Sequence, residues 1–416
     1  MRSWPSVYLP PSDVSTEHPV LRLTDSYKNE VIELKDLPIT SYVCGITPYD
    51  ATHLGHAATY LTFDLIHRFV IASGKKLHYT QNITDIDDPL LERAKRDNQN
   101  WEDLATSQIE LFREDMTELR VLPPDNYLGV VESMPKVIEH IMALINTGNT
   151  YELQGDIYLD LNAIPDALTD LPVSLDEALA IFAARGGDPG RTGKRHPLDT
   201  LIWSAQRPGE PSWESPFGNG RPGWHIECVA IALDTLTGQP WGNAESSTSI
   251  SLQGGGSDLR FPHHYMTSVQ ARAITGRKFA RVYLHAGMIA WQGEKMSKSL
   301  GNLVFVSKLR EVGWSGNEIR LALINRDYRT DLNWEMGLLE EARFNLQRIN
   351  SALSREEVAP TQNIVLEIRN SLSNDLNVQG AIKAVLEWCK ETEAGAGGGS
   401  AGELSRALDL YLGIAL

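Results

Sequence analysis

"YVCGITPYDATHLGHAATY", residues 42–60, decides the fold of this chain because it joins a predicted strand to a predicted helix. The residues "TSYVCGI" (40–46) are apolar and rich in β-forming types, which predicts a buried strand. From Thr52 to Ser73 apolar side chains recur at helical spacing, and Gly74 ends the predicted helix. "LHYTQNIT" (77–84) predicts a second strand. A strand, a crossover helix and a strand indicate a parallel, doubly wound sheet.

The alternation of strands and helices continues along the chain with one interruption. A polar helix is predicted from about Asp87 to Asp97, and Asn100 is a candidate N-cap of the next helix. Residues 125–197 break the pattern and are interpreted as an insertion, which ends in a loop rich in Gly, Pro and basic residues. The insertion is predicted to hold a helix at 133–147, a strand-like stretch at 151–161 and a short helix near 174–184. After the insertion we expect strands at 199–205, 249–255 and 281–289, helices at 223–238 and 261–276, then helices at 316–327, 335–353, 361–373, 378–390 and 403–412, with a flexible linker at 394–402.

The composition is that of a soluble globular protein. With 416 residues the chain has room for two to four domains of about 100–200 residues each. No apolar run reaches the roughly 18–20 residues of a membrane span, and the N-terminus lacks the apolar core of a signal peptide. We therefore expect a cytoplasmic protein without a membrane partner. The three cysteines argue against a disulfide framework and for metal binding or burial. A net charge of -16 disfavours a broad electrostatic grip on nucleic acid, although a local basic patch stays possible.

Two histidines and a glycine open the predicted helix at residues 53–56. His53 and His56 are three positions apart, so their side chains share one helix face. In isolation such a pair is more often an ordinary core or surface pair. Here the pair follows a strand of a parallel sheet, where helix N-termini bind phosphate through free N–H groups. Gly55 has no side chain, so a base or ribose could lie against the backbone.

A second candidate motif is "KMSKS", residues 295–299. Lys295 and Lys298 lie in a loop bounded by Gly293 and Gly301. Two ammonium groups on such a loop can close over a triphosphate and stabilise the charge that moves onto pyrophosphate. Taken alone, an exposed basic loop without such a role is the commoner explanation.

Together these motifs resemble the class I aminoacyl-tRNA synthetases. Longer stretches resemble the cysteine-activating branch of that family, and the resemblance covers roughly residues 20–335. These stretches are "YVCGITPYD" (42–50), "NITDIDD" (82–88), "GEPSWESPFGNGRPGWHIEC" (209–228), "GGGSDLRFPHH" (254–264) and "GEKMSKS" (293–299). The resemblance implies an α/β fold with a Rossmann-like class I synthetase catalytic domain, an insertion and a C-terminal α-helical bundle.

The same resemblance implies a division of the chain into five parts. Residues 1–124 would form the first half of the catalytic domain and 125–197 the insertion, or connective, domain. Residues 198–294 would complete the catalytic domain, and 295–334 would hold the KMSKS loop and the stem-contact region. Residues 335–416 would form a short C-terminal helical domain.

In the cysteine-activating branch a zinc ion holds the thiol of the substrate. The resemblance implies one zinc per chain, with the ligands Cys44, Cys228 and His263. The chemistry agrees, because thiolates and imidazole are preferred zinc ligands and three ligands leave one position open. A substrate thiolate can fill that position far better than the hydroxyl of serine, so no editing domain is needed. His225, His264 and His285 are less favoured as ligands, and Cys389 is expected to be a packing residue.

Three features depart from the synthetases. Thr267 stands where they usually have a glutamate four residues after the zinc histidine, and Ala58 stands where they usually have an arginine. From Glu335 onward the chain has 12 acidic and 7 basic residues, a net charge of -5 that suits tRNA poorly. These departures resemble the cysteine ligases of mycothiol biosynthesis, which join cysteine to the amine of glucosaminyl-inositol. "ARGGDP" (184–189) resembles the ERGGDP motif of that family, with Ala184 in place of the glutamate.

The ligase resemblance implies a reaction in two steps, with ATP, L-cysteine and an amino-sugar inositol acceptor as substrates. Mg²⁺ would accompany ATP, and we expect a monomer that does not bind tRNA. The residues implied in catalysis are His53, His56, Lys295 and Lys298. The positions implied in binding ATP, the adenylate and cysteine are Cys44, Gly45, Ile46, Thr47, Gly55, Thr59, Asn82, Ile83, Thr84, Trp224, Gly256, Ser257, Asp258 and Ile289. The base for the acceptor amine stays open between Asp258 and an unassisted neutral amine.

Two other functions are compatible with parts of the sequence. A true cysteinyl-tRNA synthetase with a shortened C-terminus would share every motif of the catalytic domain. A catalytically inactive relative could act as a zinc-dependent binding module. The intact histidine pair, both lysines of the KMSKS motif and all three candidate zinc ligands argue against the inactive relative.

Overall fold

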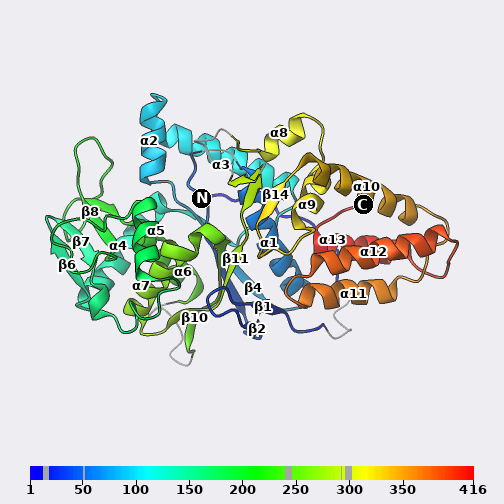
Figure 1. Ribbon diagram of the computed structural model, residues 1–416, viewed down its shortest axis with the longest axis horizontal. Coiled ribbons are helices and arrows are strands. Elements are labelled where there is room, and N and C mark those ends of the chain that lie inside the picture. Colours follow the sequence, from blue (N-terminus) through cyan, green and yellow to red (C-terminus); the bar gives the residue numbers. More distant parts are fainter. Residues whose placement is uncertain (13–17, 50–51, 239–245, 292, 296–301) are drawn as a thin grey trace.

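A parallel sheet stands at the centre of the computed structural model, between the helices of the insertion and the C-terminal helices (Figure 1). The structure describes residues 1–416 apart from 13–17, 50–51, 239–245, 292 and 296–301. Within the described residues this sheet has five strands, and every pair of neighbours is parallel. In spatial order the strands are β11 (Lys278–Ala286), β10 (Thr248–Gly256), β3 (Ile39–Val43), β4 (Leu77–Ile83) and β5 (Asn126–Gly129).

Helices cover both faces of this sheet, as a doubly wound fold requires. Alternate strand residues enter two separate cores: Val43 joins the core on one face, and its neighbour Tyr42 joins the core on the other. The first core is shared with α1 (Leu54–Ala72) and α3 (Trp101–Glu118). The second is shared with α4 (Val130–Asn146), α6 (Trp224–Leu236) and α7 (Tyr265–Thr275). The predicted fold class is therefore confirmed.

Helix α1 crosses from β3 to β4, and its ends are set by local sequence. His53 is the N-cap and its Nδ1 accepts a hydrogen bond from the Gly55 N–H at 3.1 Å. Ser73 is the C-cap, and Gly74 follows with φ of 72°, a conformation that favours glycine. A Cβ on Gly254 would come within 2.1 Å of the Phe63 ring, so the close approach of α1 to β10 requires that glycine.

The loops between β4 and β5 also follow the sequence pattern. Helix α2 (Asp88–Arg96) begins after Asp87, as predicted. Asn100 caps α3, because its Oδ1 accepts hydrogen bonds from the N–H groups of Glu102 at 2.8 Å and Asp103 at 3.0 Å. The predicted cap is therefore confirmed.

The insertion is built on an antiparallel sheet. Its strands are β6 (Thr150–Leu153), β7 (Asp156–Leu159), β8 (Leu201–Ala205) and β9 (Gly220–Pro222), and a 3₁₀ turn (Leu161–Ala163) and helix α5 (Leu175–Ala184) follow β7. The strand-like stretch predicted at 151–161 is in fact a hairpin, since the chain turns at Gln154 and Gly155, both with positive φ. β5 belongs to the parallel sheet, whereas β8 and β9 belong to the antiparallel one. The expected borders at 124/125 and 197/198 therefore do not coincide with the edges of the two sheets.

Shorter elements complete the fold around the parallel sheet. A hairpin of β1 (Arg22–Thr24) and β2 (Val31–Glu33) precedes β3. β10 continues into a 3₁₀ turn (Ser257–Leu259) and a five-residue π-helical turn (Arg260–His264) before α7. β12 (Ile289–Trp291) lies between β13 (Glu294–Lys295) and β14 (Leu332–Trp334), and α8 (Val306–Glu311) and α9 (Gly316–Ile324) lead into the C-terminal helices.

The C-terminal helices are α10 (Met336–Leu353), α11 (Gln362–Ser373), α12 (Val378–Glu393) and α13 (Ala401–Leu412). They dock on α1 through buried charges. Arg68 bonds to Asp64 at 2.7 Å and donates to the carbonyl oxygen of Asp409 at 2.8 Å. Arg320 bonds to Asp64 as well, and its Nε donates to the carbonyl oxygen of Leu412 at 2.5 Å. These contacts tie the predicted C-terminal bundle to the helix that carries the His53 and His56 motif.

Candidate active site

The end of strand β3 places Cys44 between two neighbouring strands. Its backbone N–H bonds to the carbonyl oxygen of Gly254 on β10 at 3.0 Å. The next residue, Gly45, donates its N–H to the side chain of Asn82 on β4 at 2.8 Å. A Cβ on Gly45 would lie 1.5 Å from the carbonyl oxygen of Asn82, so only glycine fits there. Cys44 is thus held at the carboxyl end of the parallel sheet, where ligands of such folds bind.

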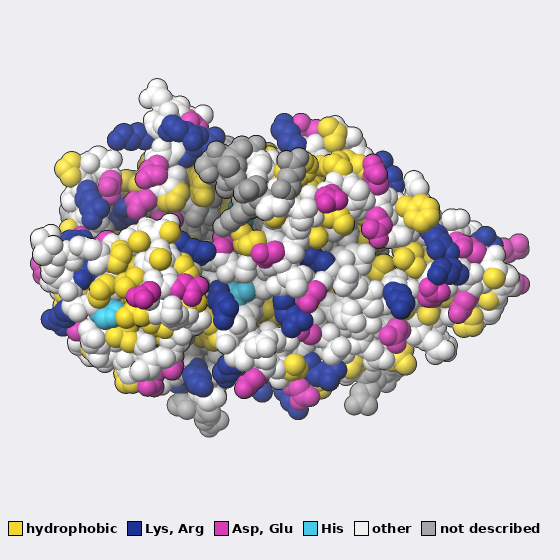
Figure 2. Space-filling view, viewed as in Figure 1, with side chains coloured by type: hydrophobic (Ala, Val, Ile, Leu, Met, Phe, Trp, Pro, Cys, Tyr) yellow, Lys and Arg dark blue, Asp and Glu magenta, His cyan; other side chains and the backbone are white. Residues whose placement is uncertain are grey.

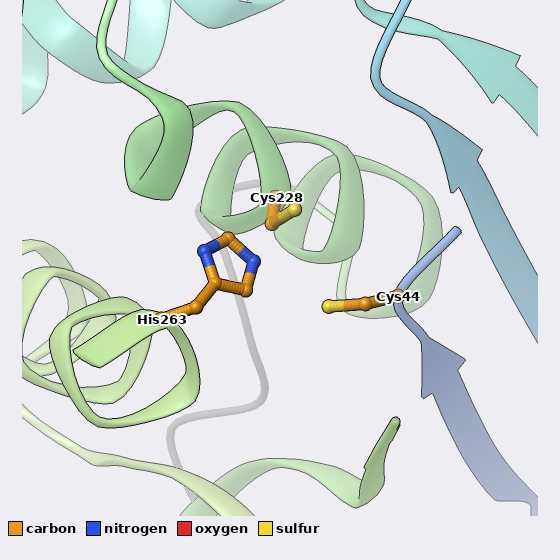
Figure 3. A group of neighbouring side chains, drawn as sticks. All are labelled: Cys44, Cys228 and His263. Atoms are coloured by element: carbon orange, nitrogen blue, oxygen red, sulfur yellow. The ribbon is translucent and has the colours of Figure 1, made fainter. Parts of the chain in front are cut away.

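Two other residues bring ligand atoms to Cys44. Cys228 lies on the second turn of α6, and His263 lies in the π-helical turn that precedes α7. The candidate ligand atoms of all three residues are within 4.8 Å of one another. Figure 3 shows the two sulfur atoms and the imidazole ring turned toward a common centre. The side chains are almost inaccessible, with exposures of 5% for Cys44 and 1% each for Cys228 and His263.

The ring of His263 presents one particular nitrogen to this centre. Its Nδ1 is 2.9 Å from Nδ1 of His225, and the Trp224 ring stacks on it at 4.0 Å between centroids. Its Nε2 is buried and has no partner among the described residues. A buried nitrogen without a partner is costly unless a ligand satisfies it. Two sulfur atoms and one such nitrogen are a donor set that fits a metal ion.

Burial controls the protonation of these ligands. It raises the pKa of the Cys44 thiol well above its ordinary value, and the neighbouring Cys228 raises it further. It also lowers the pKa of His263 well below the ordinary value for histidine. Without a cation, Cys44 keeps its proton and the His263 ring is neutral. A bound dication would displace the thiol protons, so binding would be coupled to proton release.

Thr267 is not available as a further ligand. It lies one helical turn after His263, is fully buried, and donates its hydroxyl to the carbonyl oxygen of His263 at 2.7 Å. The Thr267 hydroxyl is therefore already used in a hydrogen bond to the preceding helical turn. The expectation of three protein ligands matches the group that the described residues form.

The histidine pair lies at the start of α1, as predicted. The rings of His53 and His56 stack at 3.8 Å between centroids and 27° between planes. A Cβ on Gly55 would come within 2.9 Å of the His53 ring, so the glycine makes room for this stacking. Nδ1 of His56 is buried without a partner in the described structure, and burial lowers the pKa of His56 to about 4. At neutral pH His56 therefore offers an N–H group and no positive charge.

The other predicted binding positions gather along the same edge of the sheet. A Cβ on Gly256 would lie 2.7 Å from Oδ1 of Asp258 and 3.7 Å from Oγ1 of Thr59, which shows that β10 and α1 meet there. Thr84 donates its backbone N–H to the carbonyl oxygen of Ile46 at 3.0 Å. The edge thus brings together Cys44, Gly45, Ile46, Thr47, Asn82, Ile83, Thr84, Gly55, Thr59, Gly256, Ser257 and Asp258, with Trp224 beside His263 and Ile289 just beyond β11.

Not all of these side chains are free to touch a ligand. Asn82 is buried and its side chain already serves the protein: it accepts from Gly45 and from the hydroxyl of Tyr42, and it donates to Thr84 at 3.2 Å. Ile83 and Ile289 are buried apolar residues. Their place in the site is to shape the sheet edge, whereas Thr47, Thr59 and Asp258 are partly exposed.

The KMSKS motif falls largely outside the described residues, which omit 296–301 and hence Lys298. The backbone of Lys295 pairs with Ala290 in the hairpin of β12 and β13, so this residue begins the motif in a strand and not in a loop. After the motif, the N–H of Leu54 bonds to the carbonyl oxygen of Val304 at 2.9 Å, and His53 bridges to Phe305. The segment therefore begins in the hairpin of β12 and β13 and ends beside the histidine pair.

Comparisons with known proteins agree with this geometry. Residues 30–344 match the family described as "tRNA synthetases class I (C) catalytic domain". Over the whole of both chains the protein is 47% identical to the L-cysteine:1D-myo-inositol 2-amino-2-deoxy-alpha-D-glucopyranoside ligase 2 of Corynebacterium jeikeium. It is 49% identical to the corresponding ligase of Acidothermus cellulolyticus, with 93% of this chain and 94% of the relative covered. The chain belongs to this ligase family.

Solved structures show the same fold at low sequence identity. Methionyl-tRNA synthetase of Mycobacterium tuberculosis, in complex with methionyl-adenylate, aligns with a TM-score of 0.62 and 15% identity over 91% of this chain and 89% of that one. The leucyl-tRNA synthetase of Agrobacterium radiobacter K84 gives a TM-score of 0.62 at 12% identity, over 92% and 84% of the two chains. The expected class I synthetase architecture is confirmed.

Two supporting features of this site were not predicted from the sequence. Arg185 of the RGGDP stretch donates to the carbonyl oxygen of Phe261 at 3.1 Å, so the insertion braces the turn that carries His263. The doublet His263–His264 sends its two rings to different partners, because His264 contacts Cys44 and His285. The doublet was visible in the sequence, but only the π-helical turn determines where each ring points.

Proposed function

We propose that this chain is an ATP-dependent ligase that joins L-cysteine to the amine of 1D-myo-inositol 2-amino-2-deoxy-α-D-glucopyranoside, a step of mycothiol biosynthesis. The observation that carries the proposal is the buried group of Cys44, Cys228 and His263 beside the histidine pair, in a chain that matches the ligases over its full length. The reaction would pass through cysteinyl-adenylate and release AMP and pyrophosphate.

Selection of cysteine is assigned to the three buried ligands. Cys44, Cys228 and Nε2 of His263 would hold one zinc ion per chain, which when bound offers an open coordination position to the thiol of the substrate. All three residues are buried, the backbone N–H of Cys44 bonds to Gly254 and the ring of His263 contacts His225, so the ligand atoms are held in place away from water. A serine hydroxyl would lose both the metal–sulfur bond and the fit to these ligands.

Activation of cysteine is assigned to the start of α1 and the KMSKS motif. The substrate carboxylate forms a bond to the α-phosphorus of ATP, the bond to the β-phosphate bridge breaks, and pyrophosphate leaves. The N–H groups of His53 and neutral His56 would bind phosphate oxygens, while Lys295 and Lys298, with Mg²⁺ on ATP, would supply the positive charge. Catalysis of this kind consists mainly of positioning and charge stabilisation.

In the second step the sugar amine attacks the acyl carbon of the adenylate. A carbon–nitrogen bond forms, the bond from the acyl carbon to the AMP oxygen breaks, and the amine loses one proton. Asp258 is partly exposed and adjoins Gly256 and Thr59 at the sheet edge, so it could accept that proton. Water could accept it equally well from an amine that arrives neutral.

A cysteinyl-tRNA synthetase is the second candidate, because the family matched by residues 30–344 contains the catalytic domain of these enzymes. The C-terminal charge argues against it, since residues from Glu335 onward carry a net charge of -5. On the face shown in Figure 2, lysine and arginine side chains over these helices are interspersed with acidic ones. A tRNA requires an extended basic contact surface.

One experiment separates the candidates. The purified protein is incubated with ATP, Mg²⁺ and labelled cysteine, first alone to measure ATP–pyrophosphate exchange, then with either acceptor. We expect exchange that depends on cysteine, and transfer of label to glucosaminyl-inositol but not to tRNA. Label on tRNA alone would replace the proposal with the synthetase, and the absence of exchange would indicate an inactive relative.

Location and assembly belong to the same proposal. None of the helices in the described part of the chain is long and apolar enough to cross a membrane. We infer a monomer in the cytoplasm, because the substrates are small polar molecules and the site is assembled from one chain. Light scattering on the eluting protein tests the monomer, and a dimeric mass would contradict it.

A further inference from the structure

Cys44 has a second histidine neighbour that is not one of the three candidate ligands. Nε2 of His264 lies 3.1 Å from Sγ of Cys44. Nδ1 of the same ring lies 2.8 Å from Nε2 of His285, at the end of β11. His264 is 0% exposed and His285 is 5% exposed. These three side chains form a continuous buried row that ends on the sulfur atom, and we call it the Cys44–His264–His285 row.

Hydrogen bonding rules assign the protons along this row once Cys44 is a thiolate. A thiolate can only accept, so Nε2 of His264 must carry hydrogen. Nδ1 of a neutral His264 then accepts, so Nε2 of His285 must carry hydrogen as well. The remaining nitrogen, Nδ1 of His285, is buried without a partner among the described residues. Each ring therefore has one proton, and both protons point toward the sulfur.

The surrounding fold is shaped to hold these rings. A Cβ on Gly255 would lie 2.8 Å from Cε1 of His264, so this glycine makes the space in which the ring rests on β10. His285 is fixed by its backbone N–H, which bonds to Oγ of Ser26 at 3.1 Å, and its ring packs edge-on against Tyr27 at 5.7 Å. Three parts of the fold therefore fix the orientation of the His264 ring and its N–H: β10 through Gly255, β11 through His285, and the loop between β1 and β2 that holds His285.

The net charge of the metal site explains why a hydrogen bond to the Cys44 thiolate would stabilise it. Two thiolates would neutralise a bound zinc ion, whereas a third thiolate, from bound cysteine, would leave a net charge of -1 among buried side chains. Buried charge without compensation is costly. A hydrogen bond to a ligand sulfur draws charge away from the metal and fixes the orientation of the ligand.

We propose that His264, oriented by His285, donates a hydrogen bond to the Cys44 thiolate and thereby stabilises the state of the site that holds the thiolate of the substrate. This inference deepens the proposed function and depends on its metal site. His264 is a positioning residue, because it acts on substrate through Cys44. Its effect is expected to be larger when cysteine is bound than when the site is empty of substrate.

The experiment compares four variants of the full-length protein. His264→Leu removes the donor, His264→Gln keeps an N–H near the position of Nε2, and His285→Leu removes only the orienting contact. His140→Leu is the matched control, because His140 is a fully buried histidine on α4 away from this row. Circular dichroism establishes that each variant is folded. One rate and one spectrum are measured. The rate is the loss of zinc to a chromogenic chelator with and without cysteine, and the spectrum is the sulfur-to-metal absorption of the cobalt(II)-substituted protein.

We expect zinc loss from His264→Leu to be about 10–100-fold faster, the usual cost of removing an outer-shell partner of a metal ligand. Added cysteine should protect the wild type and His264→Gln much more than His264→Leu, with His285→Leu between them. The cobalt absorption should shift in His264→Leu and return in His264→Gln. If His264→Leu does not fold, His285→Leu and His264→Gln still test the order of effects.

The outcomes also separate this inference from the proposed function. Zinc retention and cysteine protection equal to His140→Leu in both His264→Leu and His285→Leu would overturn the role of His264 and leave the ligase assignment intact. A wild-type protein that holds no zinc and ignores cysteine would overturn the metal site itself, and this inference with it.

Discussion

The edge of the parallel sheet contains buried polar atoms without partners among the described residues, whereas polar groups under the C-terminal helices are bonded within the protein. At the sheet edge, Nε2 of His263 and Nδ1 of His56 are buried and have no partner among the described residues. Under the C-terminal helices, Asp64 is bonded to both Arg68 and Arg320, and the Trp388 indole donates to a carbonyl oxygen at 2.9 Å. Helix α1 connects the two regions, since it begins at the histidine pair and carries Asp64 in its middle.

This difference separates function from stability. Groups left without partners in a dry site are costly in the free protein and become satisfied only by a ligand. Groups satisfied within the protein hold the helices together and have nothing left to offer a substrate. The C-terminal helices therefore support α1, and the proposed recognition of small molecules is assigned to the sheet edge.

Among these predictions, removal of a metal ligand at the sheet edge should cause the largest loss of zinc and activity. In Cys228→Ser a weakly binding hydroxyl replaces a thiolate, so the site should lose most of its zinc and its affinity for cysteine. We expect exchange activity to fall by more than about 10³-fold, above the loss typical for one charged contact. Elemental analysis and ATP–pyrophosphate exchange measure both. A matched Cys389→Ser variant, in the helical region, should keep zinc, and full retention in Cys228→Ser would move the metal elsewhere.

The next largest effect is expected in the KMSKS motif. Lys298→Ala should slow adenylate formation by about 10²–10³-fold, because a phosphate-binding charge acts as pyrophosphate leaves. Binding of cysteine should be unchanged, since the thiol site is separate from the phosphates. Single-turnover kinetics measure the chemical step, and calorimetry measures cysteine binding. Unchanged adenylation would make the lysine a structural residue and would shift the phosphate site toward the histidines alone.

Residues at the sheet edge could be predicted from the sequence because they belong to short local motifs. The sequence places Cys44 at the end of a strand, the histidine pair at the start of a helix and Asn100 at the cap of another, and the structure agrees, although β3 already ends at Val43. Cys228 and His263 are far from Cys44 along the chain, and only the resemblance to synthetases joined them. Sheet membership was harder, because β8 reads like a buried parallel strand but pairs with the hairpin of β6 and β7.

Two other features could not be predicted because they depend on long-range contacts. The glycine-rich stretch at 394–402 has the composition of a flexible linker, yet the N–H of Gly399 bonds to the carbonyl oxygen of Val358 at 2.9 Å. Asp64 bonds to Arg68 one turn along α1 and to Arg320 on α9, and no local pattern indicates the second partner. Composition describes what a segment can do alone, whereas packing decides what it does in the fold.

Breaking the buried charges should test the supporting role of the C-terminal helices. Asp64→Ala leaves Arg68 and Arg320 buried without their carboxylate, which should lower the free energy of unfolding by about 3–5 kcal/mol. Glu311→Ala breaks an exposed pair with Lys308 and should cost no more than about 1 kcal/mol. Urea denaturation measures both. Equal effects of the two variants would contradict a buried network that holds α1 in place.

Replacement of His56 should have a smaller effect, on how the stability of the protein depends on pH. Burial lowers the pKa of His56 to about 4, whereas the unfolded chain has an ordinary histidine pKa of about 6.5. Between these values the unfolded state binds more protons than the folded state, so stability contributed by neutral His56 is lost as the pH falls from about 6.5 to about 4. His56→Gln should flatten the pH dependence of the unfolding midpoint in this window. An unchanged slope would mean that His56 is not held neutral.

The smallest effect is expected from salt, and it sharpens the contrast between the two regions. If recognition is confined to the sheet edge and the acidic C-terminal helices bind no nucleic acid, the affinity for the amino-sugar acceptor should change by less than about twofold between 50 and 200 mM salt. The salt dependence grows with the number of charged contacts, and this acceptor carries at most one charge. A tRNA held by 6–10 phosphate contacts would lose about 10³–10⁵-fold in affinity over the same range. Steady-state ligation at several salt concentrations, with the acceptor near its KM, gives the slope. A salt dependence that corresponds to several phosphate contacts would instead indicate that the C-terminal helices bind a polyanion such as tRNA, contrary to their net negative charge.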